Sequence, residues 1–233
     1  MKDIEFLKSN LIAHRGLHDL KNPENSMGAF RKAISSNYII ELDVHLLRDN
    51  TIVVFHDDNL YRMTGKRQNL KDLTYDDIKD LKLLNTSYGI PTLDEVLKLV
   101  SGQVPIIIEL KYDLKAGLLE KRLAPLLDNY DGDFCVKSFN PLSVRWFKKY
   151  RPNYIRGLLI SNKRETLKEK IVSSHISYFL CKPDFISCSY KLYNNKRIKS
   201  YMNKIPVIAW TIRSEKTYNM YRDKFYNLIT ENI

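Results

Sequence analysis

Short apolar segments recur along the chain at intervals that leave room for one helix between most neighbours. The candidate strands are 11–14, 39–45, 52–55, 104–110, 133–138, 155–160, 184–188, 205–211 and 227–230. Alternation of strands and helices is typical of parallel βα units, because a parallel pair needs a crossover connection. The 233 residues suit one closed barrel of eight such units, which takes about 250 residues. We therefore predict an α/β fold, a TIM (β/α)8 barrel that forms a single domain over 1–233.

One strand more than a barrel requires is explained by the second and third segments. They lie too close for a crossover helix, so we expect them to pair antiparallel as a hairpin. A turn centred on Asp49 and Asn50 would place Asp43 directly opposite His56, with both side chains on one face. The return strand then opens an insertion at about 46–90, which leaves eight strands for the barrel.

Capping signals mark several helices between the strands. Asn25 is the expected N-cap of a helix that ends at about residue 36, and Thr92-Leu-Asp-Glu95 has the spacing of a capping box. Asn140-Pro141 places an N-cap residue before a proline, which predicts a helix through Tyr150. Later helices are expected over 164–174, 190–202 and 214–224.

Composition narrows the class of protein. No segment resembles a signal peptide or approaches the roughly 20 apolar residues that span a bilayer, so we expect a cytoplasmic location. The cysteines Cys135, Cys181 and Cys188 lack metal-site spacing and are expected to be small buried hydrophobes. The formal charge of +11 favours anionic partners, but it is spread along the chain. Such partners are a phosphorylated substrate, a membrane surface or nucleic acid. We expect a small phosphorylated substrate rather than nucleic acid, and leave peripheral membrane contact and the oligomeric state open.

The first apolar segment stops abruptly at His14-Arg15-Gly16. An imidazole moves protons near neutral pH, and a guanidinium binds a phosphate through two parallel hydrogen bonds. Gly16 permits a tight backbone turn behind them. The tripeptide indicates acid–base chemistry on a phosphate ester, although such a tripeptide also ends strands by chance.

Acidic side chains interrupt two later apolar strands. Glu41 and Asp43 stand two residues apart on one strand, so they share a face. Glu109 ends another strand, and three carboxylates gathered there would repel one another unless a cation intervened. Oxygen ligands suit a hard divalent ion, which predicts a metal site. Structural salt bridges are the alternative.

Two further residues support a catalytic site. His56 is expected to face Asp43 across the hairpin, and Lys111 shares a strand face with Glu109. Lys111 is either the salt-bridge partner of that acid or a cation that stabilises negative charge developing on a phosphate. The remaining histidines, His18, His45 and His175, are expected to be structural or solvent-facing. His45 also lies on the same strand face as Glu41 and Asp43, so it could be a spare metal ligand.

At these residues the chain resembles the glycerophosphodiester phosphodiesterases, members of the superfamily of phospholipase C-like phosphodiesterases with a TIM-barrel fold. The motifs that carry the resemblance are His14-Arg15-Gly16, Pro23-Glu24-Asn25-Ser26, Glu41-Leu-Asp43-Val, Val53-Val54-Phe55-His56-Asp57, Thr64-Gly65, Ile90-Pro91-Thr92-Leu93 and Glu109-Leu110-Lys111. Beyond residue 111 the likeness thins to Ser138-Phe139-Asn140, Trp210-Thr211 and Ile229-Thr230. Departures are Asn37-Tyr38 for a usual glycine, Asp49-Asn50 for an Asp-Gly turn, and Glu231 for a closing aspartate.

The resemblance implies roles for these residues. Glu41, Asp43 and Glu109 would bind one divalent metal ion, Mg²⁺ or Ca²⁺ with Mn²⁺ as a further option, while His14 and His56 would act as general base and general acid in an order left open. Arg15 and Lys111 would stabilise the phosphate. Candidate substrate-binding residues are Phe139, Trp210 and Asn25; ordinary packing at the barrel mouth is the alternative for the two aromatic ones.

The function expected from these observations is metal-dependent hydrolysis of glycerophosphodiesters to glycerol 3-phosphate and an alcohol. A lysophospholipase D acting on lysolipids is the first alternative, and it would need an apolar surface for the acyl chain. A non-catalytic barrel that binds an anionic polymer is the second. That barrel would bind with a steep salt dependence, but it has no need of two histidines and three acids so arranged.

Overall fold

The computed structural model describes residues 2–111, 116–161 and 175–233, with backbone only at 175–176. A closed barrel of eight parallel strands forms its centre, and one further strand pairs antiparallel with β2. The strands are β1 (Ile12–Ala13), β2 (Ile39–Leu46), β3 (Ile52–Val54), β4 (Ile106–Leu110), β5 (Phe134–Ser138), β6 (Ile155–Ile160), β7 (Phe185–Ser189), β8 (Val207–Ile212) and β9 (Asn227–Thr230). The TIM-barrel prediction is confirmed.

Closure of the barrel depends on its shortest strand. β1 pairs in parallel with β2 on one side and with β9 on the other. The nine strands expected from the sequence are all present, with ends that differ by at most two residues.

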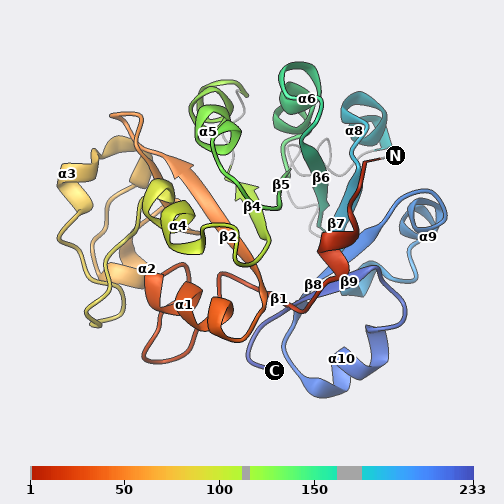
Figure 1. Cartoon of the computed structure of the whole chain (residues 1–233), viewed down its shortest axis with the longest axis horizontal. Coiled ribbons are helices and arrows are strands. Elements are labelled where there is room, and N and C mark those ends of the chain that lie inside the picture. Colours follow the sequence, from red (N-terminus) through yellow and green to blue (C-terminus); the bar gives the residue numbers. More distant parts are fainter. Residues whose placement is uncertain (1, 112–115, 162–174) are drawn as a thin grey trace.

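Helices surround the barrel in chain order (Figure 1). They are α1 (Met27–Ser35), α2 (Tyr61–Thr64), α3 (Tyr75–Ile78), α4 (Leu93–Val100), α5 (Leu118–Asp128), α6 (Pro141–Tyr150), α8 (His175–Cys181), α9 (Lys196–Met202) and α10 (Glu215–Tyr221), with 3-10 turns at Glu5–Lys8, Leu70–Asp72 and Tyr190–Leu192. The capping box at Thr92 and the cap at Asn140 are confirmed. The helix expected over 190–202 is split, because Asn195 caps a new helix. The helix expected over 164–174 lies outside the described residues.

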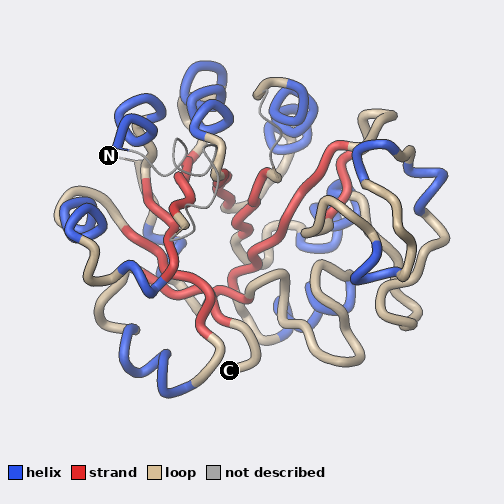
Figure 2. Tube along the Cα trace, turned by 180° about the vertical axis from the view of Figure 1, so that it is seen from behind, coloured by secondary structure: helices blue, strands red, loops and turns tan. Residues whose placement is uncertain are grey.

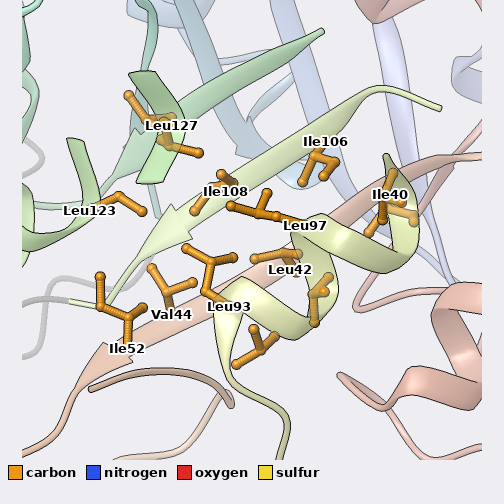
Figure 3. Packing of buried hydrophobic residues seen from close by; sticks show 14 of the residues in the cluster. Ile40, Leu42, Val44, Ile52, Leu93, Leu97, Ile106, Ile108, Leu123 and Leu127 are labelled. Atoms are coloured by element: carbon orange, nitrogen blue, oxygen red, sulfur yellow. The ribbon is translucent and has the colours of Figure 1, made fainter. Parts of the chain in front are cut away.

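The alternation of side chains along β2 and β4 separates a packed outer face from the barrel interior. Ile40, Leu42 and Val44 point outward with Ile106 and Ile108, where they pack against the apolar face of α4 (Figure 3). The intervening residues, which include the acidic ones, therefore point inward. Apolar burial on the outer face thus holds three carboxylates in the interior.

The barrel interior near the amino-terminal ends of the strands is apolar. Its cluster takes one residue from each barrel strand and two from the N-terminal segment: Ile12, Ile39, Ile107, Cys135, Ile155, Phe185, Ile208 and Ile229, with Ile4 and Leu7. Most of these residues stand in the first half of their strands, so the polar interior is confined to the carboxyl ends. That is the face on which barrels of this fold carry their sites.

The insertion between β2 and α4 lies to one side of the barrel and consists mainly of loops (Figure 2). It has a small core of its own, in which Leu60, Met63 and Ile78 are buried. Val53 and Phe55 also belong to this core, so the strand β3 joins the insertion to the barrel.

Candidate active site

A cavity of about 730 Å³ opens at the carboxyl ends of the strands. Seven of the predicted site residues line it: His14, Arg15, Glu41, Asp43, His56, Glu109 and Lys111. Phe139 and Trp210 line it as well. The strand ends thus bring together residues that are far apart in the sequence.

The floor of the cavity is an acidic cluster. Carboxylate oxygens of Glu41, Asp43 and Glu109 lie within 4.8 Å of one another, and all three residues are buried. Three hard oxygen donors at this spacing fit a divalent ion such as Mg²⁺ or Ca²⁺. The arrangement therefore agrees with the predicted metal site, and the oxygen chemistry does not distinguish among hard ions.

Lysines neutralise this cluster. Lys111 Nζ lies 2.7 Å from both Asp43 and Glu109, and Lys137 Nζ lies 2.8 Å from Glu41. Burial would raise the pKa of Asp43, but Lys111 and Arg15 outweigh burial and hold that pKa well below its usual value. The same contacts raise the pKa of Lys111 despite its own burial. Asp43 and Lys111 are therefore charged at neutral pH.

His14 is held by a carboxylate from the far end of the sequence. Its Nδ1 donates to Oε2 of Glu231 at 2.7 Å, and Oε1 of Glu231 accepts from Nε of Arg213 at 3.0 Å. Burial opposes ionisation of Glu231, but these hydrogen bonds keep its pKa well below the ordinary range. Because an ionised carboxylate only accepts hydrogen bonds, the proton of neutral His14 sits on Nδ1 and leaves Nε2 as the basic nitrogen.

His56 is held by its neighbour in the chain. Its Nδ1 donates to Oδ1 of Asp57 at 2.6 Å, and Asp57 also accepts from Arg62. Burial would raise the pKa of Asp57, but these contacts lower it from 3.8 to about 2. In both imidazoles, therefore, Nδ1 is hydrogen-bonded to a carboxylate and Nε2 is the nitrogen that can accept a proton.

The hairpin register expected from the sequence is wrong by one residue. Val44 pairs with Val54, and the backbone amide of Phe55 donates to Asp43. Asp43 thus stands opposite Phe55, whose side chain is buried in the insertion core. His56 nevertheless reaches the cavity, because β3 ends at Val54 and the chain bends at His56.

A chain of ion pairs connects the insertion to the barrel mouth. Arg15 Nη1 donates to Glu24 at 2.7 Å, Glu24 accepts from Arg62 at 2.6 Å, and Arg62 binds Asp57. Arg15 Nε also lies 3.3 Å from Asp43.

The backbone turn that follows His14 and Arg15 is tight, as predicted. Gly16 has φ of +79°, and a Cβ there would lie 2.9 Å from Ala29.

Asn25 is placed differently from the prediction. The N-cap of α1 is Ser26, whose hydroxyl accepts from the amide of Ala29. Asn25 does not line the cavity described above; it is buried, and its side-chain amide donates to Oδ2 of Asp43 at 2.9 Å. The N-cap prediction is therefore wrong by one residue, and we propose that Asn25 positions Asp43 rather than contacting substrate.

Two aromatic side chains form part of the cavity lining. The rings of Phe139 and Trp210 meet edge to face, with centroids 6.1 Å apart. Trp210 Nε1 is buried without a hydrogen-bond partner in the described part of the protein. An apolar surface of this kind suits the alcohol part of a polar ligand.

The other histidines and the cysteines contribute packing. His45 is half-buried, and its Nε2 donates to the backbone carbonyl of His56 at 3.2 Å; desolvation is the main cause of its lowered pKa. His18 likewise has a pKa lowered chiefly by burial. The side chain of His175 lies outside the described residues. The cysteines are free and buried, as expected.

Sequence reasoning missed Lys137 and the role of Glu231. The signal for Lys137 was a lysine within the apolar strand Phe134–Ser138. Glu231 was noted only as a departure from a motif. Their roles depend on which strands become neighbours in the closed barrel, and this arrangement is not a local property of the sequence.

Proton-transfer groups, cations that bind anions and an oxygen cluster for a metal meet in one barrel mouth, which is the constellation of a hydrolase for anionic esters.

Among the described residues, no helix is both long enough and apolar enough to cross a bilayer. The predicted cytoplasmic location stays a prediction.

Comparisons with known proteins agree with this class. The model of the glycerophosphoryl diester phosphodiesterase family matches residues 14–229. A glycerophosphodiester phosphodiesterase from Caldanaerobacter subterraneus subsp. tengcongensis is 31% identical over 97% of this chain and 95% of its own length. A human lysophospholipase D is 34% identical over 71% of this chain and 55% of its own length.

Solved structures share the fold. A glycerophosphodiester phosphodiesterase from Thermotoga maritima has a TM-score of 0.73 at 25% identity, covering 95% of this chain and 94% of that one. A phosphodiesterase from Oleispira antarctica, in complex with sn-glycerol-3-phosphate, has a TM-score of 0.79 at 23% identity, covering 95% and 92%. The chain belongs to the glycerophosphoryl diester phosphodiesterase family, and the predicted enzyme class is confirmed.

Proposed function

We propose that the protein hydrolyses glycerophosphodiesters to glycerol 3-phosphate and an alcohol, with one divalent metal ion bound by Glu41, Asp43 and Glu109. The observation that carries this proposal is the oxygen cluster on the cavity floor, with His14 and His56 in the wall of the same cavity. The complex of the Oleispira antarctica neighbour with sn-glycerol-3-phosphate supports the product.

Binding of the phosphodiester requires positive charge, because three carboxylates already occupy the site. The metal ion would supply Lewis acidity at a phosphoryl oxygen. Arg15 and Lys111 add fixed cations beside it, and both are held in place by Asp43. The same cations stabilise the additional negative charge of the pentacoordinate transition state. Phe139 and Trp210 would contact the glycerol or the alcohol.

Proton transfer falls to the two histidines. One imidazole takes a proton from the nucleophile as the new P–O bond forms. The nucleophile is water, or it is the neighbouring glycerol hydroxyl, in which case water then opens the cyclic phosphate to give glycerol 3-phosphate. The other gives a proton to the leaving alcohol as the old P–O bond breaks. Glu231 and Asp57 hold the rings with Nδ1 protonated and stabilise the positive charge that an imidazole gains as base.

The experiment that tests this proposal measures glycerol 3-phosphate released from glycerophosphocholine. Wild type, His14→Ala and His56→Ala are assayed with EDTA and then with Mg²⁺, Ca²⁺ or Mn²⁺ restored. We expect turnover that depends on the metal, and a loss of about a hundredfold or more in either variant. His18→Ala is the matched control, since His18 does not line the cavity. Turnover that EDTA and both histidine variants leave unchanged would contradict the proposal.

A second candidate activity is that of a lysophospholipase D. The matching human lysophospholipase D favours it, and so does a neighbouring cavity of about 650 Å³ that shares Lys111 with the site and is lined in part by Leu46, Leu118 and Leu119. Apart from one further leucine, polar and charged residues form the rest of its lining, so an acyl chain would contact the leucines alone. Leu118 is 70% exposed, so it is open to such a chain.

The two activities are separated by comparing rates on glycerophosphocholine and on lysophosphatidylcholine micelles. Leu118→Asp should reduce only the lysolipid rate if the leucine surface holds the acyl chain. Leu142→Asp is the control, because Leu142 is also exposed but does not line that cavity. A lysolipid rate equal in both variants would remove the support for this candidate.

A further inference from the structure

One lysine in the lining of the active-site cavity contacts the acidic cluster but has no part in the proposed reaction. Lys137 stands on β5 in register with Glu109 of β4, and its side chain is 2% exposed. Its Nζ lies 2.8 Å from Oε1 of Glu41 and 3.3 Å from Oε2 of Glu109. A lysine is almost never fully buried unless it is paired, and both partners here belong to the metal cluster.

Every carboxylate oxygen of that cluster already contacts a cation or a hydrogen-bond donor of the protein. Lys137 takes one oxygen of Glu41 and one of Glu109, and Lys111 takes the other oxygen of Glu109 and one of Asp43. The remaining two accept from the side-chain amide of Asn25 and the backbone amide of Arg15. A divalent ion that binds these carboxylates must therefore compete with cations already in contact with them.

The two lysines differ in how far their ammonium groups can move away from the carboxylates. Lys111 is 15% exposed and lines both the site and the neighbouring cavity, so its ammonium group can turn toward a phosphate or solvent. Lys137 also lines the site, but it is only 2% exposed, and Cys135 before it on β5 belongs to the apolar cluster of the barrel interior. Its charge remains next to the carboxylates when a metal ion arrives.

We propose that Lys137 is a tethered counter-ion of the metal site. It neutralises the carboxylates when the site holds no divalent ion, and it weakens the binding of that ion by repulsion and by competition for Glu41 and Glu109. The inference rests on the proposed metal site and adds a residue that sets its affinity. Exchange of metal, rather than permanent retention, follows from this arrangement.

The inference predicts opposite effects on the two forms of the protein. Without metal, a neutral residue at 137 leaves Glu41 and Glu109 short of a counter-charge, so the midpoint of thermal unfolding falls. With metal, the repulsion is gone and affinity rises by about tenfold or more. A lysine that only supported the barrel would lower the midpoint in both forms and leave the affinity unchanged.

The experiment measures Mg²⁺ and Mn²⁺ affinity by isothermal titration calorimetry, with thermal unfolding in EDTA and in saturating metal. Lys137→Gln and Lys137→Met remove the charge, and Lys137→Arg retains it. Arg156→Gln is the matched control, because Arg156 is a buried cation on the next strand, β6, whose partner Asp184 is outside the cluster. The two neutral variants guard against a failure of one to fold.

We expect the neutral variants to bind metal about tenfold more tightly, with a larger rise in the unfolding midpoint on adding metal. Lys137→Arg and Arg156→Gln should bind as the wild type does. Equal or weaker binding by the neutral variants, with binding by the wild type intact, would overturn the role of Lys137 alone. Absence of binding by wild type and neutral variants alike would overturn the metal site and this inference with it.

Discussion

The two walls of the active-site cavity are built from different chemistry. The wall formed by β1, β2, β4 and the hairpin carries the acidic cluster, His14, His56 and Arg15. The wall formed by β6 to β8 carries Trp210 and Tyr190 beside Lys191 and Arg213, which are residues suited to contact rather than proton transfer. From this difference we infer that the proposed reaction and the recognition of the substrate are assigned to separate parts of the barrel.

The largest effect should come from the first wall. Asp43→Asn removes the carboxylate that contacts Arg15, Lys111 and Asn25 at once. We expect kcat/KM to fall by at least about a thousandfold, because the variant loses a metal ligand and frees two phosphate-binding cations. Steady-state kinetics on glycerophosphocholine test this. A loss confined to KM would mean that the first wall serves recognition and would break the comparison.

A smaller loss is expected where the far end of the chain meets the first wall. Glu231→Gln keeps a hydrogen-bonding group near His14 but removes the charge that fixes its ring. We expect kcat to fall by about ten- to a hundredfold with KM little changed. Glu231→Asp, which keeps the charge, should lose less. Equal kcat in wild type and Glu231→Gln would show that the pairing does not orient His14.

The second wall should respond in KM. Trp210→Ala removes the ring that packs against Phe139, and we expect KM to rise about tenfold with kcat within about threefold of the wild type. Trp146→Ala is the control, since Trp146 stacks on Tyr150 of α6, outside the cavity. A fall in kcat that exceeds the rise in KM would place part of the chemistry in the second wall.

The smallest effect concerns stability in acid. Asp57 has a pKa lowered from 3.8 to about 2 in the folded protein, because Arg62 and His56 outweigh its burial. Its ionised form therefore stabilises the fold above about pH 4, and this contribution is lost as the pH falls toward 2.

Asp57→Asn should accordingly be less stable than the wild type by up to about 1 kcal/mol at pH 5, because the carboxylate is partly exposed. The difference should shrink at pH 2.5. Urea unfolding at the two pH values measures it. A difference that grows on acidification would contradict the assigned direction.

Most groups of the first wall could be predicted from the sequence, but two residues that contact that wall, Lys137 and Glu231, could not. Each group of the first wall follows an apolar run directly, so strand parity alone places Glu41 and Asp43 on one face. Lys137 and Glu231 gain their meaning only from neighbours that the closed barrel supplies. The hairpin register failed because the sequence gives no sign that Phe55 belongs to the insertion core, whereas the bend that brings His56 back to the cavity is a tertiary feature.

The pairing of β1 with β9 links catalysis to the order of folding. The amide of His14 donates to the carbonyl of Thr230, and its ring is held by Glu231, so this half of the proposed acid–base pair is completed by contacts across almost the whole sequence. Contacts of such separation are the slowest to form. During synthesis the hairpin can present His56 to Asp57 early, but His14 gains its partner only after the last strand has docked. Only a chain with a closed barrel would therefore be active, and an incompletely folded chain would not hydrolyse lipid-derived diesters.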